Sequence, residues 1–246
     1  MLTKDQAVCI RAVDYSETSQ VVTFFTRTTG KIGTIAKGSK RPKSPFGGPI
    51  EIFSTGRIVF SATTDDKLAA LTEFEPQDSF SGLARNLSAM NSCLFAVELL
   101  DKLTKDYDPH PQLFDSFLQF LKNTSEMQSR PSTVSLLILF QLSLLNEIGL
   151  QPVLNHCANC KASNERRAAS DELYFSSSVN GLICRDCESA FVDKVRLSPN
   201  AAKCLSNLKL LADANEKTLN EIEKILIHHF TELLHKPPKM AKHILK

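Results

Sequence analysis

Residues Gln20–Ala36, QVVTFFTRTTGKIGTIA, decide the architecture of the amino-terminal part of this chain. Gln20–Arg27 and Lys31–Ala36 are rich in β-branched and aromatic residues, which favour extended backbone. Thr28-Thr29-Gly30 lies between them and is typical of a turn. We therefore expect two short strands separated by a tight connection.

The same pattern extends outward from this segment. Turn residues separate three further runs with strand composition, which are Ala7–Val13, Ile50–Phe60 and Leu68–Phe74. Five short strands within about 75 residues are typical of a small closed barrel. An open sheet is the alternative, because spacing alone does not distinguish the two.

From Phe80 the apolar period changes from two to 3.6 residues, which predicts helices. The pattern predicts three successive helices, Phe80–Leu103, Pro111–Lys122 and a third from Ser129-Arg130-Pro131 to Gly149. Proline suits the first helical turn and glycine the position after the last. The third helix is apolar nearly all round, so we expect it at the buried centre of the helical region.

Two more helices are predicted near the carboxyl end. Ser198-Pro199 opens a helix whose apolar positions continue to Leu211, and Thr218-x-x-Glu221 resembles a capping box before the last helix. From Leu233 onward the chain contains lysines and no acidic residue. We expect this tail to be frayed.

Composition excludes several classes of protein. The 246 residues carry 29 Lys and Arg against 27 Asp and Glu, with 42% apolar and 23% charged residues, which is ordinary for a folded domain and unlike a polycation or an acidic disordered chain. The amino terminus lacks the apolar core of a signal peptide. The most apolar run, Val134–Leu145, is too short to span a bilayer, so we expect a cytoplasmic protein without membrane contact.

Two C-x2-C pairs are the strongest chemical motif. They are Cys157-Ala-Asn-Cys160 and Cys184-Arg-Asp-Cys187, and together they supply four thiolates, enough to close a tetrahedral Zn²⁺ shell. The hairpin pattern Tyr174-Phe175, Asn180-Gly181, Leu182-Ile183 in the spacer would return the second pair to the first. One structural zinc ion is the expectation. An iron–sulfur cluster and four unrelated buried cysteines are the alternatives.

The remaining cysteines and the two adjacent histidines have a simpler interpretation. Cys9, Cys93 and Cys204 lie on apolar faces and are expected to be small buried hydrophobes. His228-His229 are expected to be structural. The sequence contains no nucleotide-hydrolysing loop, catalytic serine elbow or metalloprotease motif, so we expect no enzymatic activity.

The amino-terminal region is locally basic. No acidic residue lies between Glu17 and Glu51, and the cations in that interval are Arg27, Lys31, Lys37, Lys40, Arg41 and Lys43. The loop Lys37–Lys43 is stiffened by prolines and has little prospect of packing into a core. A cationic track on a small barrel is typical of a surface that contacts phosphates without sequence preference.

Other residues could extend such a surface. Arg57 is a further candidate for DNA contact, with Lys4 and Arg11 secondary. Base stacking is a possible role for four phenylalanines, Phe24, Phe25, Phe46 and Phe53, although Phe24 and Phe25 point to opposite sides. The alternative is an ordinary solvated loop.

The order of these parts resembles the bacterial RecO family of recombination mediators. The resemblance covers essentially the whole chain and rests on Ala7–Glu17, Phe24–Lys31, the loop Ala36–Ser44, Glu147–Pro152 and the two cysteine pairs. It implies an α+β protein with an OB-fold barrel in residues 1–78, a helical domain in 79–150 and 196–246, and a zinc-finger insert in 151–195. Some family members lack the cysteines, so the metal is not essential to the family's activity.

The resemblance also implies a function. It implies binding to single- and double-stranded DNA, annealing of complementary strands, and work with RecR to load recombinase, hence indirectly RecA, onto strands coated by single-strand-binding protein. The helical domain would receive the carboxyl-terminal tail of that coating protein, and the protein would associate with the nucleoid. The alternatives are a zinc-ribbon adaptor that does not bind DNA directly and a metal-dependent nucleic-acid enzyme.

Overall fold

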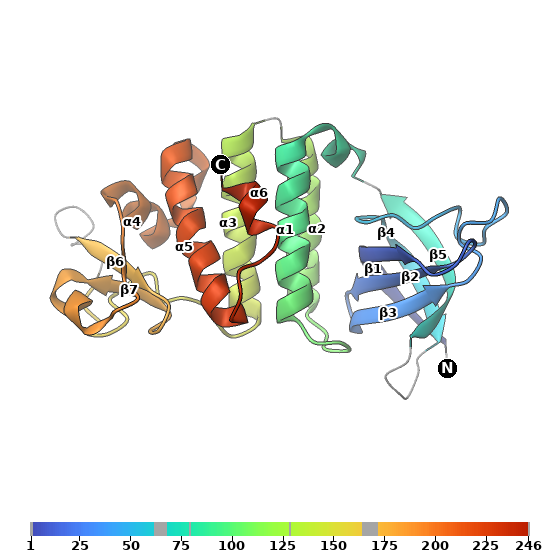
Figure 1. Ribbon diagram of the computed structural model, residues 1–246, viewed down its shortest axis with the longest axis horizontal. Coiled ribbons are helices and arrows are strands. Elements are labelled where there is room, and N and C mark those ends of the chain that lie inside the picture. Colours follow the sequence, from blue (N-terminus) through green and yellow to red (C-terminus); the bar gives the residue numbers. More distant parts are fainter. Residues whose placement is uncertain (1, 62–67, 79, 128, 164–171, 246) are drawn as a thin grey trace. The chain divides into compact units, whose positions relative to one another are not determined.

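The computed structural model describes residues 2–61, 68–78, 80–127, 129–163 and 172–245 (Figure 1). By its internal contacts the chain divides into two compact units. Unit 1 comprises Met1–Arg85 and Leu100–Ser125, and unit 2 comprises Asn86–Leu99 and Glu126–Lys246.

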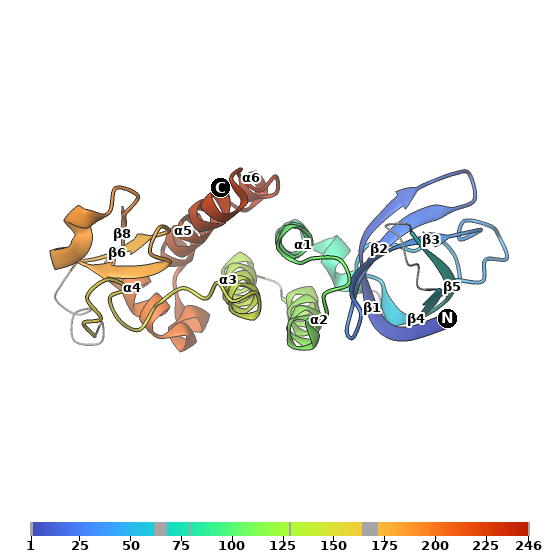
Figure 2. The ribbon, with the colours of Figure 1, turned by 90° about the horizontal axis from the view of Figure 1, so that it is seen from below.

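Unit 1 is built around a closed five-stranded barrel. The strands are β1 (Leu2–Asp14), β2 (Gln20–Thr26), β3 (Gly30–Ala36), β4 (Thr55–Ser61) and β5 (Ala69–Asp78). They follow one another round the barrel in the order β1-β2-β3-β5-β4, and β1 pairs with β4 to close it, as the view of Figure 2 shows. The β3–β5 pair is parallel and the other pairs are antiparallel. The barrel is confirmed over the open sheet.

Alternating residues of the strands fill the barrel. Phe24 is fully buried in this core and lies 5.8 Å from Phe74, measured between ring centroids. Its neighbour Phe25 points outward and packs on Phe114 of helix α2 (Pro111–Glu126) at 6.0 Å. Adjacent strand positions face opposite sides, so the two rings are buried in different layers.

The fourth strand begins later than its sequence suggests. We expected a strand from Ile50, but β4 begins at Thr55. The backbone of Ile50 instead hydrogen-bonds the side chain of Gln20, and Phe53 has a left-handed backbone conformation with φ of 68°. Ile50 therefore fills the barrel core, while the backbone of Phe53 and Ser54 hydrogen-bonds Cys9 of β1 just before β4 begins.

Gly30, at the turn between β2 and β3, provides a stability prediction. Its φ is +82°, and a Cβ there would lie 2.3 Å from the carbonyl oxygen of Asp108. Gly30→Ala is therefore expected to destabilise unit 1 by about 3 kcal/mol, from backbone strain plus overpacking. Gly47→Ala is the matched control, because Gly47 also has a positive φ (+76°) but nothing lies near its Cβ position. Urea unfolding should show a loss of about 1 kcal/mol for the control, and equal losses would contradict the close-contact argument.

Helices occupy the rest of the chain. The helical segments are the 3-10 helix η1 (Ser81–Arg85), α1 (Leu87–Leu103), α2, α3 (Arg130–Glu147), the 3-10 helix η2 (Arg185–Ala190), α4 (Pro199–Ser206), the 3-10 helix η3 (Leu208–Asp213), α5 (Glu216–Leu234) and α6 (Ala241–Ile244). Three strands complete unit 2, namely β6 (Leu173–Ser176), β7 (Gly181–Cys184) and β8 (Val195–Arg196). Among the described residues, no helix combines the length and the apolar character needed to cross a membrane.

The predicted third helix is confirmed. Pro131 lies in the first turn of α3, and Gly149, with φ of 76°, follows the C-cap residue Ile148. Most of the helix is buried and it packs against α5 and η3, although Leu139 is 40% exposed. Leu139 therefore departs from the expectation of burial on all sides.

Three expectations for the carboxyl-terminal part are wrong. The helix that opens at Ser198 ends at Ser206, because Asn207 caps a separate 3-10 segment. The N-cap of α5 is Asn215, whose side chain accepts the N–H of Thr218 at 2.9 Å. Glu221 does not close a capping box, since its carboxylate accepts the N–H of Ser198 at 2.6 Å.

The lysine-rich tail is ordered rather than frayed. The N–H groups of Lys239 and Met240 both donate to the carboxylate of Glu98 at 2.7 Å. Ala241 and Ile244 of α6 are buried. These two anchors outweigh the mutual repulsion of the tail's cations.

Candidate nucleic-acid interface and metal centre

The loop between β3 and β4 carries the basic cluster, and its second half is anchored in the barrel. Phe46 and Ile50 belong to the hydrophobic core of the barrel, with 4% and 2% exposure. The side chain of Gln20 accepts the N–H of Ile50 at 2.9 Å and donates to its carbonyl at 3.2 Å. No residue of Lys37–Lys43, the segment expected to stay out of the core, belongs to this core, and the apolar residues that do enter it follow that segment in the chain.

The first half of the loop is attached to the turn between β1 and β2. The N–H of Lys40 donates to the carbonyl of Thr18 at 3.1 Å, and the N–H of Gly38 donates to the hydroxyl of Ser19 at 3.2 Å. The ammonium of Lys40 donates to the carboxylate of Asp14 at 2.5 Å. The basic loop is therefore held against the barrel from both halves.

Three of the predicted cations have no partner in the part of the chain that the structure describes. Lys37, Arg41 and Lys43 are exposed, and their side chains make no ion pair or hydrogen bond with the described residues. Cations that are held near one another without a carboxylate partner present a local positive potential.

Lys31 was expected to contact DNA at the surface, but its side chain is buried. It is 8% exposed, and its ammonium donates to the backbone carbonyls of Asp101 and Thr104 at 2.6 and 3.1 Å. The carboxylates of Asp101 and Asp106 lie at 3.2 and 3.4 Å from the same nitrogen. A buried ammonium with this many acceptors is already satisfied, so Lys31 fastens β3 to the segment after α1.

Arg27 and Arg57 lie at the surface, each beside a carboxylate. Arg27 makes a bidentate ion pair with Asp115, with hydrogen bonds of 3.0 and 2.9 Å to the two carboxylate oxygens. These hydrogen bonds raise the pKa of Arg27 and lower the pKa of Asp115. Arg57 lies 3.6 Å from Glu75. Both pairs are about half exposed, so water and salt weaken them.

The secondary candidate Arg11 lines a cavity on the outer face of β1, β2 and β3. The cavity has a volume of about 430 Å³, and Val13, Val21 and Leu68 supply its apolar wall. Asp101 and Asp106 also line it. Those carboxylates make it a poor place for phosphate. Lys4 is exposed on β1.

The expected stacking role of the four phenylalanines is wrong. Phe24, Phe25, Phe46 and Phe53 are each at most 4% exposed, because all four fill the hydrophobic layers of unit 1. Sequence reasoning missed Tyr15, which is 67% exposed in the turn that holds the basic loop. Its position in a polar turn, outside the apolar pattern of β1, was the available indication.

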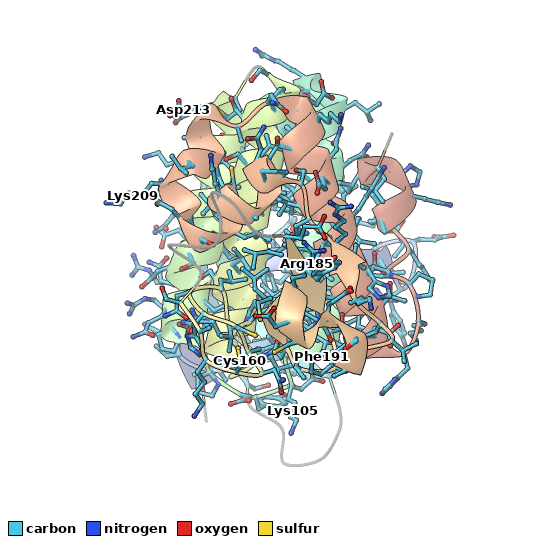
Figure 3. All side chains as sticks on the ribbon, turned by 90° about the vertical axis from the view of Figure 1, so that its left-hand side faces the viewer. Lys105, Cys160, Arg185, Phe191, Lys209 and Asp213 are labelled. Atoms are coloured by element: carbon cyan, nitrogen blue, oxygen red, sulfur yellow. The ribbon has the colours of Figure 1, made fainter. Side chains whose placement is uncertain are left out.

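In unit 2, a strand pair brings the two cysteine pairs together. The predicted hairpin is confirmed as β6 and β7, with Leu173 opposite Cys184. The segment before the first pair runs beside β7, since Leu182 donates to the carbonyl of Val153 at 2.8 Å and accepts from the N–H of Ala158 at 2.7 Å. Figure 3 labels Cys160 of the first pair and Arg185, the residue that follows β7 and begins η2.

The four sulfur atoms form a cluster of the size that a tetrahedral ion requires. All the Sγ atoms of Cys157, Cys160, Cys184 and Cys187 lie within 4.8 Å of one another, and the Cys160–Cys184 distance is 3.7 Å. With Zn–S bonds of about 2.3 Å, the edge of a tetrahedron is about 3.8 Å. The cluster therefore fits one ion with four thiolate ligands, and the alternative of four unrelated cysteines is wrong.

Local hydrogen bonds prepare one of these thiols for ligation. Burial acts to raise the pKa of Cys157, but the backbone N–H groups of Cys160, Cys184 and Asn159 outweigh it and lower that pKa to about 7. The N–H of Cys184 lies 3.4 Å from the Cys157 sulfur. Cys157 and Cys184 are buried while Cys160 is exposed, so the ion would lie at the edge of the module. The other three cysteines, Cys9, Cys93 and Cys204, are buried as expected.

A closed OB-like barrel followed by helices, with four clustered cysteines that could hold a metal ion, defines the class of protein to which this chain belongs. The chain matches the family model for the N-terminal part of recombination protein O over residues 1–80, and the model for its C-terminal part over residues 84–242. The chain therefore belongs to the RecO family of DNA repair and recombination proteins.

Curated relatives agree with this assignment. The DNA repair protein RecO of Bacillus pumilus (strain SAFR-032) is 32% identical over 241 residues, which cover 94% of this chain and 89% of that protein. The RecO protein of Bacillus subtilis (strain 168) is 30% identical over 239 residues, with the same coverage. The RecO protein of Rhodopirellula baltica is 31% identical over 204 residues, 82% of this chain and 73% of that protein.

Proposed function

We propose that this chain is a recombination mediator that binds single- and double-stranded DNA and anneals complementary strands without covalent chemistry. One observation carries the proposal. Lys37, Arg41 and Lys43 are exposed, have no carboxylate partner among the described residues, and lie on a loop that the barrel core holds in place.

The mechanism follows from charge neutralisation. Two approaching strands repel each other through their phosphates, and a fixed cluster of cations lowers that repulsion. Lys40, Arg27 and Arg57 would join the interface by exchanging an exposed carboxylate for a phosphate. Lys31 is not part of it, because its ammonium is buried and satisfied within unit 1.

Family membership supports the wider role. We infer that the chain works with RecR and with the carboxyl-terminal tail of single-strand-binding protein, and that it thereby helps to load RecA. Residues 1–78 would act as the DNA-binding barrel, 79–150 and 196–246 as the helical domain, and 151–195 as the zinc-finger insert. We place the protein in the cytoplasm at the nucleoid, and we propose one structural Zn²⁺ on Cys157, Cys160, Cys184 and Cys187.

Charge reversal tests the proposed interface. The triple variant Lys37→Glu, Arg41→Glu, Lys43→Glu removes three phosphate contacts, so the slope of log affinity against log salt for single strands should fall in magnitude by about 2. Affinity for all sequences should fall by at least about tenfold at 0.1 M salt. Fluorescence anisotropy with labelled oligonucleotides measures both quantities.

The control makes the same charge change elsewhere. Lys203→Glu, Lys209→Glu, Lys224→Glu alters exposed lysines of unit 2 and should leave the slope unchanged. An unchanged slope in the loop variant would remove the loop from the DNA site. If the unaltered protein ignored oligonucleotides at low salt, the zinc-ribbon adaptor would be the better interpretation.

Strand annealing tests the activity itself. The unaltered protein should accelerate pairing of complementary labelled strands, also in the presence of single-strand-binding protein, and the loop triple variant should lose this effect. Cleavage of labelled DNA in the presence of a divalent metal would instead identify a nucleic-acid enzyme and would contradict the proposal.

A further inference from the structure

Exposed aromatic side chains are rare in this protein. Every phenylalanine except Phe191 is buried, and Tyr174 is 8% exposed. Among the described residues, the aromatic side chains with large exposure are Tyr15 at 67% and Tyr107 at 46%. The two tyrosines are therefore the candidates for stacking on an unpaired nucleobase.

Tyr15 lies beside the basic loop. It is the first residue after β1, and its N–H donates to the carbonyl of Ser19 at 2.9 Å, which closes the turn. The same turn is joined to the loop through the contacts of Lys40 with Thr18 and of Gly38 with Ser19. A strand whose phosphates lie on the loop would thus bring its bases near the Tyr15 ring.

The charges around Tyr15 favour a polyanion. Asp14 precedes it, but its carboxylate is paired with Lys40. Glu17 is the remaining acid of the turn and is exposed, whereas the adjoining loop carries Lys37, Arg41 and Lys43, which have no partner within the described part of the chain. The balance at this end of the barrel is positive.

We infer that Tyr15 stacks on an unpaired base and makes the basic end of the barrel prefer single strands over duplex DNA. The inference rests on the proposed function and deepens it. Lysines and arginines contact phosphates equally in both forms of DNA, whereas the faces of the bases are covered by their neighbours in a duplex. An aromatic ring beside the cations therefore distinguishes the two forms, and cations alone do not.

Tyr107 is the matched control. It lies between Asp106 and Asp108 in the sequence. The carboxylate of Asp101 is also nearby, because the ammonium of Lys31 contacts both Asp101 and Asp106. Carboxylates repel the phosphates that must accompany a base, so an exposed ring in this setting should not stack on DNA. The comparison isolates the electrostatic surroundings from the exposed aromatic ring itself.

Affinity measurements test the inference. Tyr15→Ala should weaken binding to oligo-dT by about tenfold, and should leave duplex affinity and the salt slope unchanged, because no phosphate contact is lost. Tyr15→Phe should retain the affinity, since the ring face is kept. Tyr107→Ala should match the unaltered protein. Equal losses for single strands and duplex, or no loss with Tyr15→Ala, would overturn the inference.

Intrinsic fluorescence gives an independent readout. The chain has no tryptophan and three tyrosines, so the double variant Tyr107→Phe, Tyr174→Phe leaves Tyr15 as the tyrosine fluorophore. Saturating oligo-dT should quench most of its emission. Unquenched emission while anisotropy shows binding would overturn the role of Tyr15 and leave the proposed function standing. Loss of binding altogether would instead overturn the proposed function.

Discussion

Replacing Cys184 by serine is expected to abolish stoichiometric metal binding and to unfold the segments around the four-cysteine site. Structural zinc sites contribute about 10–16 kcal/mol of apparent binding free energy at neutral pH, so losing one ligand should cost several kcal/mol. The affected segments are the stretch from Val153 to Cys160, in which Val153 and Ala158 hydrogen-bond Leu182 of β7, and the 3-10 helix η2. The β6–β7 hairpin should persist longer, because Phe175 packs edge-on against His229 of α5 at 5.4 Å.

Elemental analysis and hydrogen exchange measure this outcome. The unaltered protein should hold one zinc per chain, and Cys184→Ser or a chelator should remove amide protection at Ala158 while the barrel of unit 1 stays protected. Cys204→Ser is the control, because Cys204 is buried but lies outside the sulfur cluster. Intact folding and protection in metal-free protein would contradict a structural ion, and iron in place of zinc would favour the cluster alternative.

The contribution of one buried carboxyl group to the free energy of unfolding is expected to fall by about 2 kcal/mol between pH 6.5 and pH 8. Glu223 of α5 is fully buried, and its only hydrogen bond among the described residues is one of 2.8 Å from the Gln141 amide. Burial raises the pKa of Glu223 to about 8, although the Gln141 hydrogen bond opposes the rise. The folded protein therefore keeps a proton on Glu223 that the unfolded chain has released.

The sign of this effect follows from proton linkage. Between the ordinary pKa of glutamate, 4.5, and about 8, the folded state binds one proton more than the unfolded state, so stability falls by about 1.4 kcal/mol per pH unit. His229 acts in the opposite sense at lower pH, because burial and the nearby His228 lower its pKa to about 4. Because the folded protein holds His229 in its neutral form, the free energy of unfolding decreases as the pH falls from 6.5 toward 4. Between pH 6.5 and pH 8 the effect of Glu223 is therefore separate from that of His229, whereas Cys157, whose pKa is lowered to about 7, releases its proton in the same window and opposes the fall in stability.

Glu223→Gln separates this group from the others. The amide keeps a hydrogen bond with Gln141 but carries no titrating proton, so the variant should lack the fall in stability that Glu223 causes, and it should be more stable than the unaltered protein at pH 8. Urea unfolding followed by circular dichroism at closely spaced pH values measures the slope. Parallel curves for the two proteins would show that Glu223 is not the source.

The elements with a clear period could be predicted from the sequence. In a strand or a helix, the face that packs on the core carries the apolar residues. Their spacing along the chain, two residues in the strands and 3.6 in α3, therefore indicates the type of element directly. The start of β4 could not be predicted, because Ile50 reads as a strand residue until Gln20, thirty positions away, binds its backbone. The start of α5 likewise depended on Asn215, which competes with Thr218 as a cap.

One of the two candidate sites could likewise be predicted from the sequence, and the other could not. The cysteine cluster was predictable because two ligands in each pair are neighbours, and a local hairpin supplies the return. The residue that we propose for stacking was not predictable, because the phenylalanines are buried in the barrel and against α2, whereas the more polar Tyr15 lies at the surface.

By itself, the sequence determined that this protein has a small barrel, helices, a four-thiolate site and a concentration of positive charge near the amino end. Only the tertiary structure decided which of those charges are available. Lys31 and Arg27 meet carboxylates 70 and 88 residues further along the chain, whereas Lys37, Arg41 and Lys43 meet none among the described residues. The reason is physical: a side chain's charge is a property of its residue type, but its neutralisation depends on partners that only folding brings within a few ångströms.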